Sequence, residues 1–86
     1  MLTKLKMYTL KELEQAREFI KSRPAGWIKV LNRTGKFYWG EATLDNTQEM
    51  HKLGPVVAAI LEQEYYYDAA KYFPASNSIM VKSSID

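Results

Sequence analysis

Apolar residues between positions 10 and 22 recur at the spacing of one face of a helix. They are Leu10, Leu13, Ala16, Phe19 and Ile20. Arg17 interrupts this stripe, but its aliphatic stem can lie along the edge of an apolar surface. Thr9 and Glu12 have the spacing of a capping box, in which each side chain accepts a hydrogen bond from the other residue's backbone amide. The sequence therefore predicts a helix over residues 10–22, ended by Pro24.

Two runs of β-forming residues, at 27–31 and 37–39, flank the turn sequence Asn32-Arg33-Thr34-Gly35. Asn at its first position and Gly at its fourth suit a type I turn with a glycine bulge, which closes a β-hairpin. This turn pairs Val30 with Phe37, and paired residues share one face of the hairpin. The expected inner face holds Ile28, Val30, Phe37 and Trp39. The expected outer face holds Trp27, Lys29, Leu31, Lys36 and Tyr38.

A second helical region follows Asp45-Asn46-Thr47, whose side chains are all suitable N-caps. Its apolar stripe is interrupted at Gly54-Pro55. We therefore expect a short helix up to Leu53, followed by a second or kinked helix with Pro55 in its first turn. The stripe continues through Val57, Ile60, Leu61 and Tyr65. The helix should fray between residues 66 and 72.

The two ends of the chain decide the predicted architecture. Residues 3–8 alternate, with Leu5 and Met7 on one face, which is typical of a strand. Residues 73–77 have the composition of a loop. Residues 78–82 predict a last strand, with the inward side chains Ile79 and Val81.

This order of elements, β-α-β-β-α-β, predicts one α+β domain over residues 1–86 with the ferredoxin-like arrangement. Its four-stranded antiparallel sheet would carry both helices on one face. If residues 1–8 are disordered, a three-stranded α-β-β-α-β sheet remains. Residues 83–86 are expected to form a flexible tail.

The composition excludes several kinds of site. The chain has no cysteine, which excludes disulfides and thiolate metal sites and favours a reducing, cytoplasmic compartment. The longest apolar run, residues 55–61, is shorter than the roughly 18 residues of a membrane span, so we expect no membrane insertion. The N-terminus lacks the apolar core of a secretory signal.

The net charge of +2 is unevenly distributed. Residues 1–36 contain nine Lys and Arg against three Glu, whereas residues 37–86 contain three Lys against seven acidic residues. This asymmetry creates opposed surface potentials unless folding interleaves the two halves.

Residues suited to catalysis or cofactor binding are sparse. His51 is the single histidine, and no second histidine or acid stands at the spacing of a metal site. No serine lies in a Gly-x-Ser-x-Gly elbow, and the four glycines are too scattered to form a phosphate-binding loop. We therefore expect no enzyme activity, no metal and no cofactor.

Two surfaces are chemically unusual. The first is the outer sheet face, where aromatic and basic side chains are expected together: Tyr8, Trp27, Lys29, Arg33, Lys36 and Tyr38, joined by Lys4, Lys6, Met80 and Lys82. Rings can stack on bases while cations neutralise phosphates. An antiparallel sheet with one ordinary solvated face would look similar.

The second surface is an acidic tyrosine patch near the end of the second helix, made of Glu62, Glu64, Tyr66, Tyr67 and Asp68. Three consecutive tyrosines, at 65–67, cannot all point inward from a helix, so at least one should be exposed. Tyrosine is enriched in protein interfaces, and flanking acids would suit a basic partner.

These features predict a small non-catalytic protein-binding domain that acts by stoichiometric association. Such a domain could regulate or inhibit a larger protein or a protein–nucleic-acid machine, as small accessory proteins of phages and mobile elements do. A homodimer is a variant of this hypothesis. The alternative is a single-stranded nucleic-acid-binding domain that uses a basic, aromatic sheet face.

Overall fold

The first helix, α1 (Leu10–Lys21), begins as expected in the computed structural model, which describes residues 4–84. The Thr9 hydroxyl accepts a hydrogen bond from the Glu12 amide at 3.1 Å, and the Glu12 carboxylate accepts one from the Thr9 amide at 2.9 Å. The predicted capping box is therefore confirmed. Most of the predicted stripe is buried or half-buried, but Leu10 in the first turn is 75% exposed.

The second helix, α2 (Gln48–Glu64), is continuous, so the break expected at Gly54-Pro55 is wrong. Thr47 caps it by accepting a hydrogen bond from the Met50 amide at 3.1 Å. A proline normally pushes the preceding residue out of the helix by clashing with its Cβ. Gly54 has no Cβ, and this space is taken by Tyr72, whose ring would lie 2.4 Å from a Cβ at Gly54.

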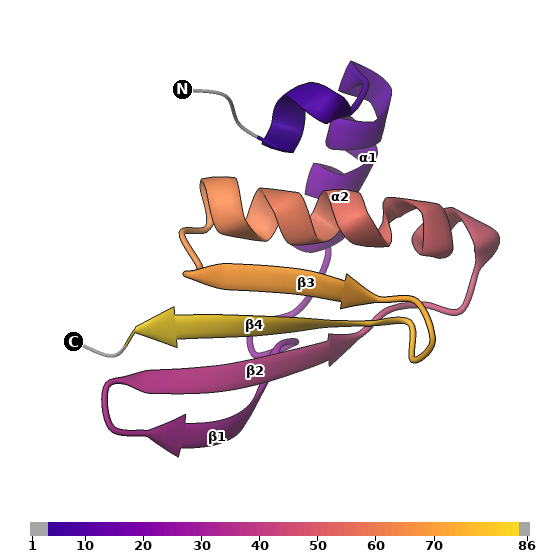
Figure 1. The fold of residues 1–86 in the computed structure, drawn as a ribbon. Coiled ribbons are helices and arrows are strands. Elements are labelled where there is room, and N and C mark those ends of the chain that lie inside the picture. Colours follow the sequence, from indigo (N-terminus) through magenta and orange to yellow (C-terminus); the bar gives the residue numbers. More distant parts are fainter. Residues whose placement is uncertain (1–3, 85–86) are drawn as a thin grey trace.

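Four strands form one antiparallel sheet in the order β1-β2-β4-β3. Their bounds are Lys29–Thr34 for β1, Phe37–Thr43 for β2, Ala69–Phe73 for β3 and Ser78–Ser84 for β4. Both helices lie on the same side of this sheet (Figure 1). The predicted α+β class, with a four-stranded antiparallel sheet and helices on one face, is confirmed.

The strand expected at residues 3–8 is wrong where the structure describes it. Lys4–Met7 is a short 3-10 helix, η1, and Thr3 lies outside the described residues. Leu5 and Tyr8 both pack against the core. Their i, i+3 spacing puts them on one side of a 3-10 turn, whereas in a strand they would face opposite ways.

The fourth strand is instead β3, in the segment where the helix was expected to fray. If the first strand of the predicted order is moved to the C-terminal end, β-α-β-β-α-β becomes α-β-β-α-β-β, which is the observed order. In space, β4 lies between the parallel strands β2 and β3, where the N-terminal strand of the predicted arrangement would lie.

The core lies between α2 and the inner side of β3 and β4. Ile79 and Val81 on β4 are fully buried, as predicted, and they meet an apolar face of α2 that includes Val57 and Ile60. By contrast, every residue of β1 is exposed. The β1–β2 hairpin therefore extends beyond the helices (Figure 1).

Two remaining expectations concern the C-terminus and the membrane. Ser83 and Ser84 belong to β4, so the predicted tail does not begin at residue 83; residues 85–86 lie outside the described part. Between residues 4 and 84, no helix has the length and apolar character needed to cross a membrane.

Candidate functional site

The turn of the hairpin lies two residues further along the chain than the predicted one. Gly35 and Lys36 form the turn, so that Thr34 pairs with Phe37. Gly35 has φ +54°, a conformation that glycine adopts without strain. An irregularity at Leu31 then shifts the register within β1. The predicted pairing of Val30 with Phe37 is therefore wrong.

Close packing near the middle of β2 decides which way its side chains point. Gly40 and Ala42 are buried on the helix side. A Cβ at Gly40 would lie 2.8 Å from Ile28 Cγ2 and 3.2 Å from Val81 Cγ2, so only glycine fits there. Because side chains alternate along a strand, Trp39 must point to the opposite face. The expected inward Trp39 is a wrong prediction.

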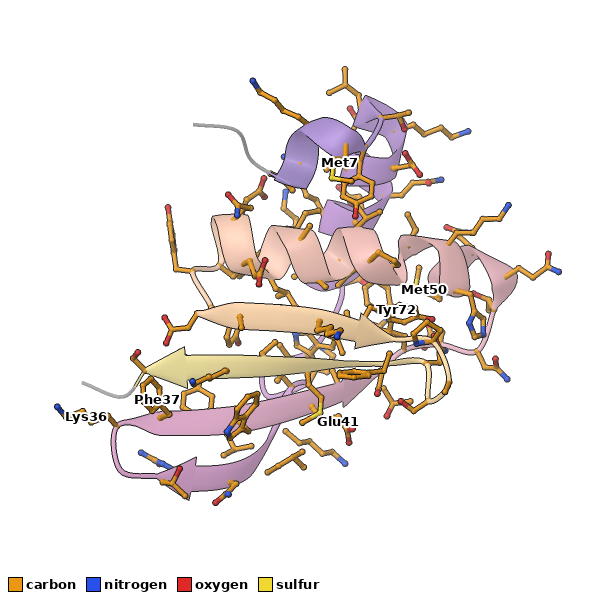
Figure 2. The ribbon with its side chains drawn as sticks, viewed as in Figure 1. Met7, Lys36, Phe37, Glu41, Met50 and Tyr72 are labelled. Carbon is orange, nitrogen blue, oxygen red and sulfur yellow. The ribbon has the colours of Figure 1, made fainter. Side chains whose placement is uncertain are left out.

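The uncovered side of the sheet, which we call the open face, carries rings, cations and one acid. It is made of Lys29, Phe37, Trp39, Glu41, Lys71, Phe73, Met80 and Lys82. Phe37, Trp39 and Phe73 are 38%, 39% and 37% exposed, which is unusual for large apolar side chains in so small a domain. Figure 2 shows Phe37 and Glu41 along β2, away from the helices.

Two lysines contact the rings of the open face. The Lys82 Nζ lies 4.3 Å from the centre of the Phe37 ring and 5.6 Å from that of Trp39. The Lys71 Nζ lies 5.6 Å from the centre of the Phe73 ring. These distances are within cation–π range. Lysine ammonium groups and aromatic rings therefore lie beside one another on the open face.

Of the predicted sheet-face residues, Lys29, Met80 and Lys82 lie on the open face, with Lys36 exposed at the adjoining turn. Arg33 and Tyr38 pair with each other on the helix side of the hairpin, and Tyr38 is half-buried. The prediction that Tyr38 points outward is wrong, because the observed register puts Tyr38 and Trp39 each on the face opposite to the expected one.

The other two predicted members lie elsewhere. Trp27 is half-buried before β1 and packs edge-on against Phe19, with ring centres 5.8 Å apart. Tyr8 follows η1, packs against the core, and lines a pocket of about 310 Å³ with Pro55 and Tyr72 on the helix side. Both were placed on the open face wrongly, because the predicted strands at 27–28 and 3–8 do not form.

The acids of the acidic tyrosine patch are engaged within the protein. The Arg17 guanidinium donates to both carboxylate oxygens of Glu64, and this hydrogen bonding lowers the pKa of Glu64. Glu62 accepts a hydrogen bond from the Ala70 amide at 2.9 Å. Asp68 accepts one from the Ser84 hydroxyl at 2.6 Å. Glu64 therefore links α2 to α1, Glu62 links α2 to β3, and Asp68 links the segment before β3 to β4.

The tyrosines of this patch differ in exposure. Tyr66 is 83% exposed and has φ 62°, so the prediction that at least one ring is exposed is confirmed. Tyr67 is half-buried, and this burial, reinforced by Tyr38 nearby, raises its pKa. Tyr65 follows α2 as its C-cap and is 45% exposed, so the predicted burial of its ring is wrong. The helix stops before this position, which removes Tyr65 from the buried stripe.

His51 belongs to a hydrogen-bonded group at the front of α2. Its Nδ1 lies 3.2 Å from the Tyr72 hydroxyl, and its Nε2 lies 3.2 Å from Asn46 Oδ1. The Tyr72 hydroxyl donates to Asn77 Oδ1 at 2.8 Å. Within residues 4–84 there is no group of three His, Asp or Glu side chains that could hold a metal ion.

No protein-family model, curated protein or solved structure matches this chain. Its function is therefore inferred from the side chains that the fold brings together.

Trp39 and Phe37 were missed as surface residues because the second strand was expected to end at residue 39. Read to residue 44, the sequence alternates polar Glu41 and Thr43 with apolar Ala42 and Leu44. This period-two pattern assigns odd positions of β2 to the solvated face. For Phe73 no local signal exists, because β3 itself was not expected.

Proposed function

We propose that this chain is a non-catalytic binding domain that associates stoichiometrically with single-stranded nucleic acid through the open face. The observation that carries this proposal is the pair of exposed rings on β2, Phe37 and Trp39, with the Lys82 ammonium within reach of both. Rings offer stacking surfaces to any base, and each stacked base contributes about 1–3 kcal/mol.

The spacing of the two rings suits an unstacked strand. Phe37 and Trp39 stand two residues apart on one face of β2, which separates their Cα atoms by about 7 Å. Stacked bases in a duplex are only about 3.4 Å apart. Two neighbouring bases can therefore stack on the two rings only if the strand is extended, so a duplex is a poor fit.

The charges around the open face favour a polyanion. In the described part of the chain, Lys29, Lys71 and Lys82 lie on it against the single acid Glu41, while Arg33 and Lys36 lie on the same hairpin. The opposite charge gathers elsewhere, in a groove of about 540 Å³ between α1 and the start of α2, rimmed by Glu14, Glu18 and Glu49. This separation directs phosphates to the sheet and away from the helices.

A protein partner is the second candidate, and the exposed aliphatic residues of the hairpin favour it. Val30 and Leu31 are 55% and 54% exposed. Together with the rings they would give an interface an apolar centre, through which the chain could regulate or inhibit a larger protein. Strand addition to the edge of β1 fits less well, because the irregularity at Leu31 and the charges of Lys29 and Arg33 are features that block edge pairing.

Fluorescence anisotropy of a labelled nine-nucleotide oligo(dT), titrated with the protein at several salt concentrations, tests the proposal. Three lysine contacts predict a slope of about −2 in a plot of log affinity against log salt. Phe37→Ala and Trp39→Ala should each weaken binding about 5- to 150-fold. Tyr66→Ala, which removes an exposed ring away from the open face, is the matched control and should bind normally.

Absence of binding at low salt would contradict the nucleic-acid proposal, as would equal binding by the Trp39→Ala variant. Recovery of partners from a nuclease-treated lysate then tests the second candidate. Its support would be a protein that is captured by the original chain and lost with Leu31→Asp, while Tyr66→Ala retains it.

A further inference from the structure

Among residues 4–84, Glu41 is the one acid of the open face, and it lies near the centre. It pairs with Lys29 of β1 on one side and with Met80 of β4 on the other. Its side chain is half-exposed and points away from the helices (Figure 2). Among residues 4–84, its carboxylate makes no hydrogen bond or ion pair, although Lys29 is its directly opposed residue on β1.

A carboxylate at this place cannot bind the backbone of a nucleic acid, because it repels phosphates. It is also acceptor-only, so its ligand must present hydrogen-bond donors, and in a base these are N–H groups. Bases that are splayed out of a stack expose their Watson–Crick edges to such contacts. Guanine presents two adjacent donors there, N1–H and the exocyclic N2–H, which match the two oxygens of a carboxylate.

The other bases match less well. Cytosine and adenine offer one amino group beside a ring nitrogen that is itself an acceptor. Thymine and uracil offer one N–H between two carbonyl oxygens, and these oxygens would face the carboxylate unfavourably. A lone carboxylate thus discriminates in favour of guanine through the donor pattern alone.

We propose that Glu41 selects a guanine in the nucleotide next to the one stacked on Trp39; this inference rests on the proposed function of the open face. Glu41 follows Trp39 at the same two-residue step that separates Trp39 from Phe37. One extended strand laid along β2 would therefore place two bases on the rings of Phe37 and Trp39 and the next base at the carboxylate of Glu41. Met80 provides an apolar contact for the guanine ring, and Lys29 and Lys71 flank the site to bind its phosphates.

Three nine-nucleotide oligonucleotides test this inference. One is dT throughout, and the other two carry a single central dG or a single central deoxyinosine, which lacks the N2 amino group, in otherwise all-dT strands. The original chain should bind the dG oligonucleotide about tenfold more tightly than all-dT, because a bidentate contact discriminates to this extent. The deoxyinosine oligonucleotide should fall between them. In Glu41→Gln, the preference for dG should fall below twofold, while affinity for all-dT should rise because a negative charge is removed.

Glu49→Gln, on the rim of the acidic groove, removes the same charge far from the open face and should keep the guanine preference. Equal binding of all three oligonucleotides by the original chain would overturn the role of Glu41 and leave the proposed function standing. A guanine preference that persists in Glu41→Gln would also overturn the role of Glu41 and leave the proposed function standing. Failure to bind any of the three contradicts the proposed function itself.

Discussion

Lys82 of β4 lies directly across the ladder from Trp39 of β2, and its ammonium is 5.6 Å from the indole ring. The same ammonium lies 4.3 Å from the Phe37 ring. In the free protein, the lysine covers part of the stacking surface. Under the proposed function, a base that stacks there would displace the ammonium toward the neighbouring phosphate, so that stacking and charge neutralisation would occur at one place.

Replacing Lys82 should therefore change the salt dependence of binding as well as its strength. Lys82→Ala removes one phosphate contact, so the log–log salt slope should become less negative by about 0.7. Lys52→Ala removes an exposed lysine of α2, away from the open face, and should leave the slope unchanged. The measurement is oligonucleotide affinity at four or more salt concentrations, and an unaltered slope in Lys82→Ala would remove this residue from the binding surface.

Gly54→Ala should destabilise the fold although alanine is the better helix former. Helix propensity favours alanine by about 1 kcal/mol. Its Cβ would lie 2.4 Å from the Tyr72 ring, and overpacking of this kind costs about 1–3 kcal/mol. Urea unfolding should show a net loss of stability, whereas Lys52→Ala in the same helix should be neutral or slightly stabilising. A more stable Gly54→Ala protein would show that the contact between α2 and β3 is looser than described.

The ion pair between Arg17 and Glu64 should stabilise the protein only above acidic pH. Hydrogen bonding to Arg17 lowers the pKa of Glu64 in the folded state. This contribution is therefore present above the pKa of Glu64 in the unfolded chain and disappears as the pH falls through the lower folded value. Both side chains are about one-third exposed, so a coupling of only about 0.2–1 kcal/mol is expected.

A double-mutant cycle of Arg17→Met and Glu64→Gln, followed by urea unfolding at neutral pH and near pH 2, measures this coupling directly. The coupling energy should approach zero at the lower pH. A value that persists there would mean that packing of the arginine stem, and not charge, links α1 to α2.

Local signals in the sequence were sufficient where neighbouring residues decide the structure. The Thr9 and Glu12 cap and the alternation around Ile79 depend on contacts within a few positions, and both predictions were correct. The register of the hairpin depends on a contact between strands instead. A turn over residues 32–35 was predicted from local sequence, whereas the close fit of Gly40 between Ile28 and Val81 accompanies the observed turn at Gly35 and Lys36.

The candidate site was predicted in its chemistry but not in its residues. An outer sheet face with rings and lysines was expected, and one exists. Lys29, Lys82 and Met80 were predicted on this face, whereas the rings of Phe37, Trp39 and Phe73 were not. The rings differ because Val30 pairs with Gly40 and not with Phe37, and a register shift by an odd number of residues exchanges the two faces of a strand. The strand that carries Phe73 forms only because α2 ends at Glu64 and its buried face covers Ala70.

The exposure of the two tryptophans tests the hairpin register without any ligand. Trp39 is 39% exposed on the open face, whereas Trp27 packs against Phe19. Acrylamide should therefore quench the fluorescence of Trp27→Phe, which retains Trp39, more strongly than that of Trp39→Phe. The reverse order would place Trp39 in the interior.

Fluorescence of the Trp27→Phe protein during titration with single-stranded oligonucleotide reports directly on stacking at Trp39. The emission should fall saturably with oligonucleotide concentration, and added salt should shift the titration to weaker binding. Under the same conditions, Trp39→Phe should show little change, because Trp27 lies away from the bound strand. An emission from Trp39 that stays constant while anisotropy reports a bound oligonucleotide would contradict the placement of the nucleic acid on the open face.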